Sequence, residues 1–265
     1  MRLILGAGYT GSRVARLALD RGEDVLCVVR SEARAQALAA RGIPVTREPA
    51  ADVARRLSSP DLHAIICFPP DGVTDAALAP LLASAGAISY VSTTGVYGDL
   101  SGTIDDATEV PPSPGNARLE AEACYRAVPG PGATILRAPG IYGPDRGLHV
   151  RIIQGLHRMP GDGSNMLSRI HVDDLAELLL ASRGVHGETF VVGDLVPATQ
   201  RDMATWICAE HGCPMPARVP AEEVHETLRR NRRIDGGRAL RMLGVTLRYP
   251  SFRDGMKKGF TGPVR

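Results

Sequence analysis

The regular alternation of short apolar runs with helical segments constrains the fold of this chain more than any other feature. Six runs are continuously apolar or β-branched, a pattern typical of strands covered on both faces, and they lie at 2–6, 24–30, 43–47, 63–68, 87–93 and 133–139. The segments between them have the spacing or composition of helices, at 9–22, 32–42, 50–57, 73–86 and 117–128. Strands that alternate with helices form a parallel sheet joined by right-handed crossovers. We therefore expect an α/β fold with a Rossmann-like doubly wound parallel sheet.

The regular rhythm stops after Pro139. The sequence then predicts a glycine-rich loop, a helix, a strand end that runs into a second helix, a late strand and a mostly helical remainder, at 140–147, 148–158, 168–183, 187–194 and 198–265. We expect a dinucleotide-binding core at 1–150 and a small C-terminal substrate lobe at 151–265, from which one or more strands return to the core. The lobe should cover the carboxyl ends of the strands, where open α/β sheets bind ligands.

A glycine-rich turn, "GAGYTG" at 6–11, follows the first strand and opens the first helix. This context favours a dinucleotide-binding site over a chance match to G-x-G-x-x-G. Gly6 permits the tight turn, Gly8 lets a pyrophosphate approach the backbone, and Gly11 lets the helix pack against the strand. Tyr9 and Thr10 begin the helix, whose free N–H groups attract phosphate. The alternative is a tight turn that binds no ligand.

The end of the second strand indicates which cofactor binds. An NAD site usually carries an acid there, which accepts hydrogen bonds from the ribose. Here Arg30 takes that place, followed by Ser31 and Arg34. Since a guanidinium group can bind a phosphate bidentately, NADP is favoured over NAD. Glu32 is the nearby acid, but it is more simply explained as a first-turn residue that complements the helix dipole. For Arg34, the alternative to cofactor binding is an exposed position on the helix.

The fourth strand is followed by "CFPP" at 67–70. Phe68 and Pro69 are therefore expected beside the adenosine ribose and the pyrophosphate. Two successive prolines also end a strand for local reasons, so that the motif has a purely structural alternative.

The net charge and the cysteines indicate which partners the protein binds and in which cellular compartment it is found. The formal net charge of +2 does not suggest nucleic acid as a partner, and the Arg-rich run at 227–241 is interrupted by acids, as a solvated surface is. Five scattered cysteines without C-x-x-C spacing indicate neither a disulfide framework nor a zinc site. Met1 and Arg2 lead directly into the first strand, with no apolar run long enough for a signal peptide or a membrane span. We expect a cytoplasmic protein that binds neither metal nor membrane.

Three further motifs occur in order: "YVSTTGVYGDL" at 90–100, "LRAPGIYGPDRG" at 136–147 and "RIHVDDLAE" at 169–177. Together with the glycine turn they resemble the extended short-chain dehydrogenase/reductases, the NAD-dependent epimerase/dehydratase superfamily. The glycine spacing resembles that of the atypical members. The resemblance implies a nicotinamide cofactor, a small-molecule substrate bound beneath the C-terminal lobe, and a homodimer formed through the fourth and fifth helices.

The resemblance also assigns catalytic positions. Thr93 matches the residue that polarises the substrate oxygen, whereas the Tyr-x-x-x-Lys pair of the family falls on Pro114 and Arg118. Proline has no proton to give. Arginine can hold a ribose hydroxyl but does not exchange protons near neutral pH. Arg118 is therefore expected to contact the cofactor, as is Pro139 at the end of the sixth strand.

Other side chains are candidates to replace the missing phenol. Tyr97 is the first candidate for proton donor, with packing or substrate contact as the alternative, and Tyr142 in "GIYG" is the second. His171 has a suitable pKa but is more simply a structural residue. Asp173 or Asp174 is expected to cap the helix that follows it.

Three functions remain open. The leading hypothesis is an oxidoreductase or epimerase-like enzyme that acts on a small substrate without the usual Tyr-x-x-x-Lys pair. The second is a non-catalytic NADP-binding sensor or partner-binding protein. The third, a nucleotide-sugar epimerase with a rebuilt site, is disfavoured because segment 140–265 is short for the substrate lobe of such an enzyme.

Overall fold

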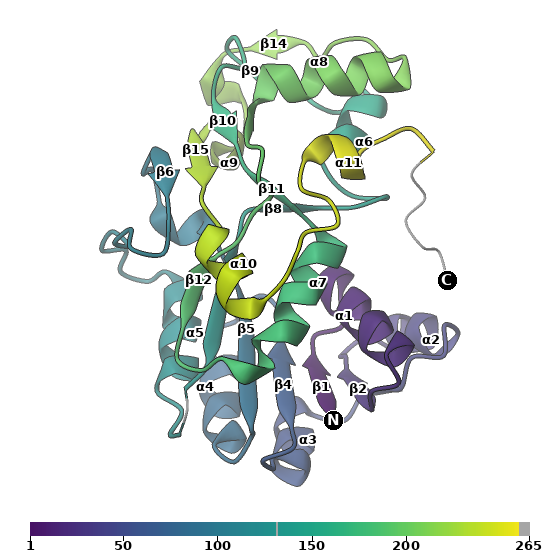
Figure 1. Cartoon of the computed structure of the whole chain (residues 1–265), viewed down its shortest axis with the longest axis vertical. Helices are drawn as coiled ribbons and strands as arrows, with labels where there is room; N and C mark the ends of the chain where they lie inside the picture. Colours follow the sequence, from purple (N-terminus) through teal and green to yellow (C-terminus); the bar gives the residue numbers. More distant parts are fainter. Residues whose placement is uncertain (131, 260–265) are drawn as a thin grey trace.

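The apolar runs form one central sheet of seven parallel strands (Figure 1). The structure, a computed structural model, describes residues 1–130 and 132–259. The strand order is β12-β7-β5-β4-β1-β2-β3, so the chain crosses the sheet in both directions from β1 and the expected doubly wound sheet is confirmed. The strands of this sheet are β1 (Arg2–Leu5), β2 (Val25–Val28), β3 (Val45–Thr46), β4 (His63–Ile66), β5 (Ala87–Thr93), β7 (Thr134–Ala138) and β12 (Thr189–Val191).

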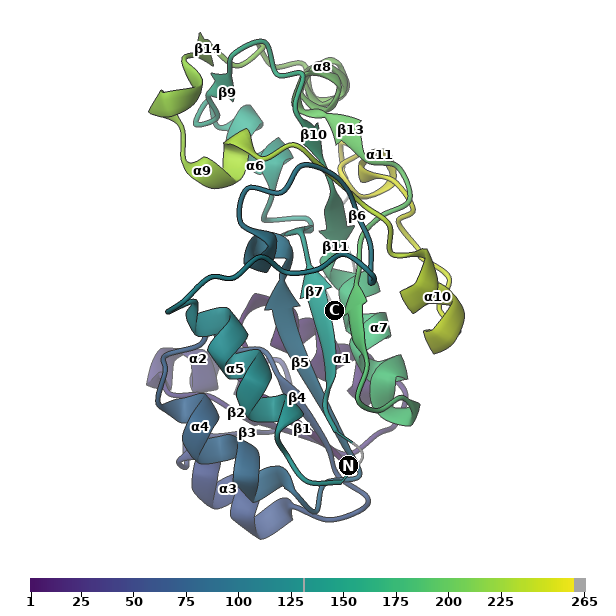
Figure 2. The same ribbon diagram turned by 90° about the vertical axis from the view of Figure 1, so that its left-hand side faces the viewer.

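Helices cover both faces of the sheet (Figure 2). Alternate residues of β1 point to opposite sides, with Ile4 in one apolar cluster and Leu3 and Leu5 in the other. The first cluster is completed by α1 (Tyr9–Asp20), α2 (Glu32–Ala39), α7 (Val172–Ala181) and α10 (Gly237–Leu243). The second is completed by α3 (Ala50–Leu57), α4 (Thr74–Leu78) and α5 (Ala117–Arg126).

A smaller group of elements lies beyond the carboxyl ends of the strands (Figure 1). Its helices are α6 (Leu148–Ile153), α8 (Gln200–His211), α9 (Glu226–Arg229) and α11 (Phe252–Gly255). Four short strand pairs lie outside the central sheet. They are β6 (Gly102–Ile104) with β15 (Arg232–Ile234), β8 (Gly140–Tyr142) with β11 (Arg169–His171), β9 (Met159–Pro160) with β14 (Arg218–Val219), and β10 (Met166–Leu167) with β13 (Ala198–Thr199).

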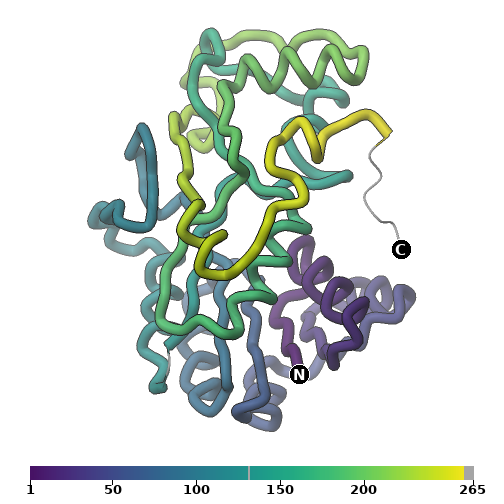
Figure 3. Tube along the Cα trace, in the orientation of Figure 1, coloured from purple at the N-terminus to yellow at the C-terminus, as the bar shows by residue number. Residues whose placement is uncertain are grey.

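The chain beyond residue 150 serves both parts of the molecule. Strand β12 joins the central sheet beside β7, and α7 packs against α1. Figure 3 shows the C-terminal segment descending from β15 to α10 and returning to α11. The division at residue 150 stays a prediction, and the last six residues of the expected lobe lie outside the described ones.

Three expected helices differ from those observed. The helix expected at 73–86 is the short α4 followed by a 3₁₀ turn at Ala79–Leu82, because Pro80 lacks the N–H that would continue an α-helix. The helix expected at 148–158 ends at Ile153. The segment 198–265, expected to be mostly helical, contains β13, β14 and β15. These strands of two or three residues pair with distant segments, so no local periodicity indicates them.

Within the described part of the chain, no helix is both long and apolar enough to cross a membrane. The five cysteines are free thiols. No group of three or more His, Cys, Asp or Glu side chains among these residues is arranged to hold a metal ion.

Candidate active site

The three glycines of the turn have different surroundings. A Cβ atom on Gly6, whose φ is +86°, would lie 2.7 Å from the Cβ and backbone nitrogen of Phe68. A Cβ on Gly11 would lie 2.8 Å from the carbonyl oxygen of Gly6 and 3.0 Å from Ile4. On Gly8 the closest atom would be 4.0 Å away. The fold itself therefore requires Gly6 and Gly11, whereas Gly8 leaves open space at the start of α1, which has no side-chain cap.

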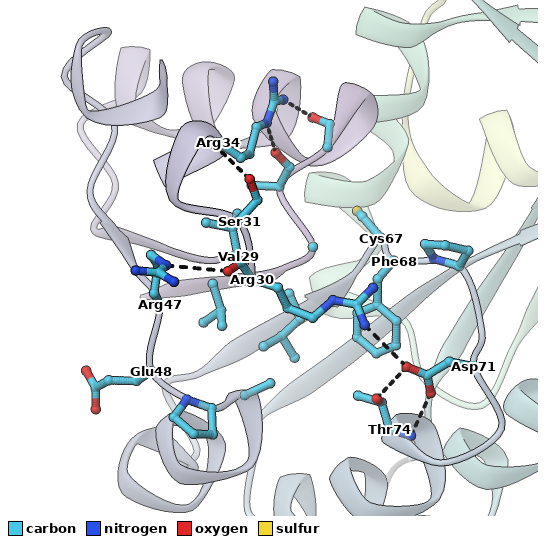
Figure 4. Close-up of a pocket in the computed structure, with 18 residues that line it drawn as sticks. Val29, Arg30, Ser31, Arg34, Arg47, Glu48, Cys67, Phe68, Asp71 and Thr74 are labelled. Atoms are coloured by element: carbon cyan, nitrogen blue, oxygen red, sulfur yellow. Dashed lines mark hydrogen bonds and ion pairs between the residues drawn. The ribbon is translucent and has the colours of Figure 1, made fainter. Parts of the chain in front are cut away.

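A cavity of about 470 Å³ opens beside this turn, at the carboxyl ends of β1, β2 and β4 (Figure 4). Seven predicted cofactor-binding residues line it: Gly6, Gly8, Arg30, Ser31, Arg34, Phe68 and Pro69. It also has charged and hydroxyl-bearing lining residues that the sequence analysis missed: Arg47, Glu48, Asp71 and Thr74. Their positions just after the third and fourth apolar runs, at the same edge of a parallel sheet, were the available signal.

Arg34 and Arg30 behave differently in this cavity. Arg34 donates from Nε to the carbonyl oxygen of Ala7 and from Nη2 to that of Gly8, both at 2.7 Å, so it ties α2 to the glycine turn. The Arg30 side chain is 87% exposed, with Nη1 3.7 Å from a carboxylate oxygen of Asp71, and it extends across the cavity near Phe68 (Figure 4). Arg30 is thus available to a ligand, while Arg34 has a structural role in the turn.

Acidic side chains and one hydroxyl complete this end of the site. The Ser31 hydroxyl caps α2 by accepting the N–H of Arg34. Glu32 lies in the first turn of α2 and pairs with Arg47. Hydrogen bonds from Thr74 hold the pKa of Asp71 below its usual value, and those from Arg56 and Thr46 do the same for Glu48. Both carboxylates that line the cavity are therefore charged at neutral pH.

A second pocket of about 290 Å³ lies at the carboxyl ends of β5 and β7, between the core and the lobe. Thr93 and Pro139 line it from the core. Thr93 Oγ1 accepts the N–H of Gly95 at 3.0 Å, which leaves the hydroxyl proton for a ligand. Arg232 donates to the carbonyl oxygens that follow β5, at Thr94 (2.6 Å), Gly98 and Leu100 (2.7 Å), and so fixes this wall of the pocket.

Tyr97 does not face this pocket. Its side chain is fully buried, and its hydroxyl accepts a hydrogen bond of 3.0 Å from Arg137. Arg137 in turn pairs at 2.7 Å with the buried Glu122. Burial tends to raise the pKa of Glu122, but hydrogen bonds from Arg137 and Ser92 outweigh it and lower the pKa. The phenol therefore belongs to a buried polar cluster.

The residues at the family's Tyr and Lys positions also lie outside both pockets. Pro114 is exposed on a turn before α5, whose N-cap is Asn116. Arg118 Nη1 donates to the Tyr90 hydroxyl at 2.9 Å and to the carbonyl oxygen of Val91 at 3.1 Å. No Tyr, His or carboxylate side chain of the described residues lines the second pocket.

Tyr9 and Thr10, the predicted cofactor-binding residues at the start of α1, are packed against other parts of the chain. Thr10 is buried in the first turn of α1. The ring of Tyr9 lies beneath the Arg146 guanidinium at 5.1 Å from its centre, against Gly143, where any side chain would collide with the Tyr9 hydroxyl. Tyr9 thus packs against the "GIYG" loop. The hydroxyl of Tyr142 in that loop is directed to the carbonyl oxygen of Ser251 at 3.4 Å.

The prediction that Asp173 or Asp174 caps α7 is wrong. The cap is His171, whose Nδ1 accepts the N–H of Asp173 at 3.2 Å. Burial lowers the pKa of His171 to about 3, which keeps the ring neutral and able to accept. Asp174 instead accepts the backbone N–H groups of Arg248 (2.8 Å) and Tyr249 (3.0 Å), and so holds the C-terminal segment against α7.

Sequence reasoning missed the charged residues of the second pocket. Arg169, Arg230 and Arg232 line it, and they come from β11 and from the start of β15. Nothing in the local pattern distinguishes Arg230 and Arg232 from the neighbouring surface arginines. Only the pairing of β15 with β6 brings them to the carboxyl edge of the sheet.

Comparisons with known proteins agree with this fold. No protein-family model and no curated protein matches the chain. Among solved structures, a conserved protein of unknown function from Silicibacter pomeroyi has 29% identity and a TM-score of 0.78, over 96% of each chain. A proposed NAD-dependent epimerase/dehydratase from Methylobacillus flagellatus has 25% identity and a TM-score of 0.71, over 96% of this chain and 95% of its own. UDP-glucuronic acid 4-epimerase from Bacillus cereus, in complex with UDP-glucuronic acid and NAD, has 18% identity and a TM-score of 0.76, over 97% and 96%.

These neighbours are members of the NAD-dependent epimerase/dehydratase superfamily or share its fold, so the resemblance identified from the sequence motifs is confirmed. The chain aligns with 96% of the Bacillus cereus epimerase chain.

Proposed function

We propose that this protein is a nicotinamide-dinucleotide-dependent oxidoreductase or epimerase-like enzyme of the cytoplasm that acts on a small substrate. The observation that carries the proposal is the placement of two pockets along one edge of the sheet. The larger adjoins the glycine turn, and the smaller adjoins Thr93. Strands β1 and β5 lead to these two sites and are separated only by β4. An extended dinucleotide could therefore lie along the edge of the sheet from one pocket to the other.

The residues of the larger cavity fit such a cofactor. Gly8 leaves open space in front of α1, whose first N–H groups have no side-chain cap, and this is the environment that a pyrophosphate requires. When bound, the nicotinamide group supplies hydride transfer. The chain itself would hold the phosphates at α1, and the Thr93 hydroxyl would donate a hydrogen bond to a substrate oxygen.

Arg30 and Ser31 support NADP as the preferred form. The exposed guanidinium and the hydroxyl adjoin the end of β2, where a 2′-phosphate would lie. Asp71 is the competing feature, because its carboxylate lines the same cavity and would accept ribose hydroxyls of NAD. NAD occupies the Bacillus cereus epimerase, so the choice has to be measured.

Calorimetric titration with NADP and NAD tests the cofactor assignment. Arg30→Asp should weaken NADP binding by about tenfold or more, since one charge-assisted contact is lost and a repulsive charge replaces it, while NAD binding is retained. Arg55→Asp, on the exposed face of α3 and outside the cavity, is the matched control. An unchanged ratio of the two affinities in Arg30→Asp would contradict the placement of the ribose.

A second candidate function is a non-catalytic NADP-binding sensor. The observation in its favour is that, in the described chain, the second pocket is lined by hydroxyl and guanidinium groups but by no side chain that exchanges protons near neutral pH. Consumption of NADPH with a broad set of carbonyl compounds distinguishes the two. Turnover that is lost in Thr93→Val supports the enzyme. Absence of turnover, together with cofactor-dependent association with a partner, supports the sensor.

The resemblance also leads us to propose a homodimer through α4 and α5. Sedimentation analysis tests this directly. A monomer at micromolar concentration would contradict it.

A further inference from the structure

A buried guanidinium group that forms no ion pair among the described residues lies in the wall of the second pocket. Arg169 lines this pocket, and its Nε is buried with no hydrogen-bond partner among the described residues. A Cβ atom on Gly140 would lie 2.1 Å from Arg169 Nη1, so the guanidinium rests directly on the glycine backbone. Gly140 thus provides the space that this side chain occupies.

The acid whose charge acts on Arg169 is Asp194. Asp194 is 2% exposed, and burial, opposed by the charge of Arg169, raises the pKa of Asp194 to about 8. Neither carboxyl oxygen of Asp194 has a hydrogen-bond partner among the described residues. The described residues form no ion pair with Arg169 within 4.0 Å. An uncompensated buried charge is costly unless something binds to it.

Arg230 lines the same pocket. Its Nη1 is 3.5 Å from the position of a Cβ on Gly95, next to Thr93, and its Nε is also buried without a hydrogen-bond partner in the described chain. Its ion pair is with the exposed Glu226. Arg232, by contrast, has its guanidinium engaged by backbone carbonyls. Arg169 is thus available to a ligand, and Arg230, which pairs with Glu226 through Nη2, keeps Nε and Nη1 for one.

We propose that the substrate of this pocket is a small oxyanion, a carboxylate or a phosphate ester, bound by Arg169 with Arg230 as a second contact. The inference rests on the proposed function in taking this pocket as the substrate site. A guanidinium fork matches both oxyanions. A volume of about 290 Å³ lies just below the usual range for ligand pockets, about 300–1,000 Å³, so the oxyanion belongs to a compact molecule. Its reacting oxygen would face Thr93.

Matched pairs of charged and neutral compounds test the proposal. Lactate is compared with lactamide and glycerol phosphate with glycerol, by calorimetric titration of the full chain with and without saturating NADP. The variants are Arg169→Met, Arg169→Lys, which keeps the charge and loses the bidentate geometry, and Arg233→Met. Arg233 is exposed on the same strand as Arg232 and does not line the pocket, so it serves as the control.

The expected result is saturable binding of at least one anion and not of its neutral counterpart. Arg169→Met should weaken that binding by about tenfold or more, Arg169→Lys by less, and Arg233→Met not at all. Comparison of the two anions identifies the oxyanion. Three results would overturn the proposal. The neutral compound could bind as tightly as its anion, the anion could bind Arg169→Met and Arg169→Lys as tightly as the wild type, or neither anion could show saturable binding. Anion binding that depends on Arg169 in a protein that binds no NADP or NAD would refute the proposed function while leaving this site in place.

Discussion

Two alanine substitutions within the glycine turn separate what the fold requires from what a cofactor requires. A Cβ on Gly11 would approach the Gly6 carbonyl oxygen to 2.8 Å and Ile4 to 3.0 Å. The first of these is backbone, so α1 has to move away from β1. A Cβ on Gly8 would meet nothing closer than 4.0 Å, but it would occupy the space where a pyrophosphate approaches the helix.

The magnitudes follow from packing and helix propensity. Overpacking costs about 1–3 kcal/mol, and replacing glycine by alanine inside a helix returns up to about 1 kcal/mol. Because the contact at 2.8 Å is with backbone, the overpacking cost belongs to the upper part of its range, about 2–3 kcal/mol. After the return from helix propensity, Gly11→Ala should lower the free energy of unfolding by about 1–2 kcal/mol. Gly8 precedes the helix and a Cβ there meets no atom closer than 4.0 Å, so Gly8→Ala should change the stability by less than about 1 kcal/mol.

Guanidinium chloride unfolding and calorimetric titration with NADP measure the two effects. Gly11→Ala should shift the unfolding midpoint without changing the slope. Gly8→Ala should keep the midpoint and lose about tenfold or more in cofactor affinity. A Gly8→Ala protein that binds NADP as the wild type does would refute the assignment of the turn as the pyrophosphate site. A Gly11→Ala protein of full stability would refute the packing argument.

Further predictions concern the buried polar groups. Glu122→Gln leaves Arg137 without its buried counter-charge and should cost about 3–5 kcal/mol in denaturant unfolding; a loss below about 1 kcal/mol would show that the pair does not support the fold. Tyr97→Phe removes one hydrogen bond from Arg137 and should cost about 0.5–1.5 kcal/mol with unchanged NADPH turnover, whereas abolished turnover in a stable variant would place the phenol in the chemistry. The folded-state pKa of Asp194, about 8, exceeds its unfolded value of about 3.9, so its contribution to stability is complete below about pH 4 and is lost as the pH rises through about 8. Asp194→Asn should remove this decline of a few kcal/mol, and equal losses of stability in both proteins between these pH values would contradict it.

Features that repeat locally could be predicted from the sequence. The strands and helices of the first half follow from period and composition, because a strand buried on both faces must be continuously apolar. The glycine turn follows from steric limits that act over a few residues, as at Gly6 and Gly11. These signals were sufficient for the parallel sheet and for seven of the residues that line the larger cavity, but they did not give the strand order.

Burial and long-range pairing decided the rest. Tyr97 lies only four residues after Thr93, but one side chain enters a buried cluster and the other lines a pocket. Arg169 faces that pocket because β11 pairs with β8, which places Gly140 beside it from a distant part of the chain.

The sequence by itself thus determined the parallel sheet and the turn that adjoins the larger cavity. The tertiary structure decided which arginines are tied to backbone carbonyls, as Arg34 and Arg232 are, and which face a pocket, as Arg169 does. The physical reason is that helix and strand periodicity is a property of neighbouring residues. The environment of a charged side chain depends on whatever the fold packs against it.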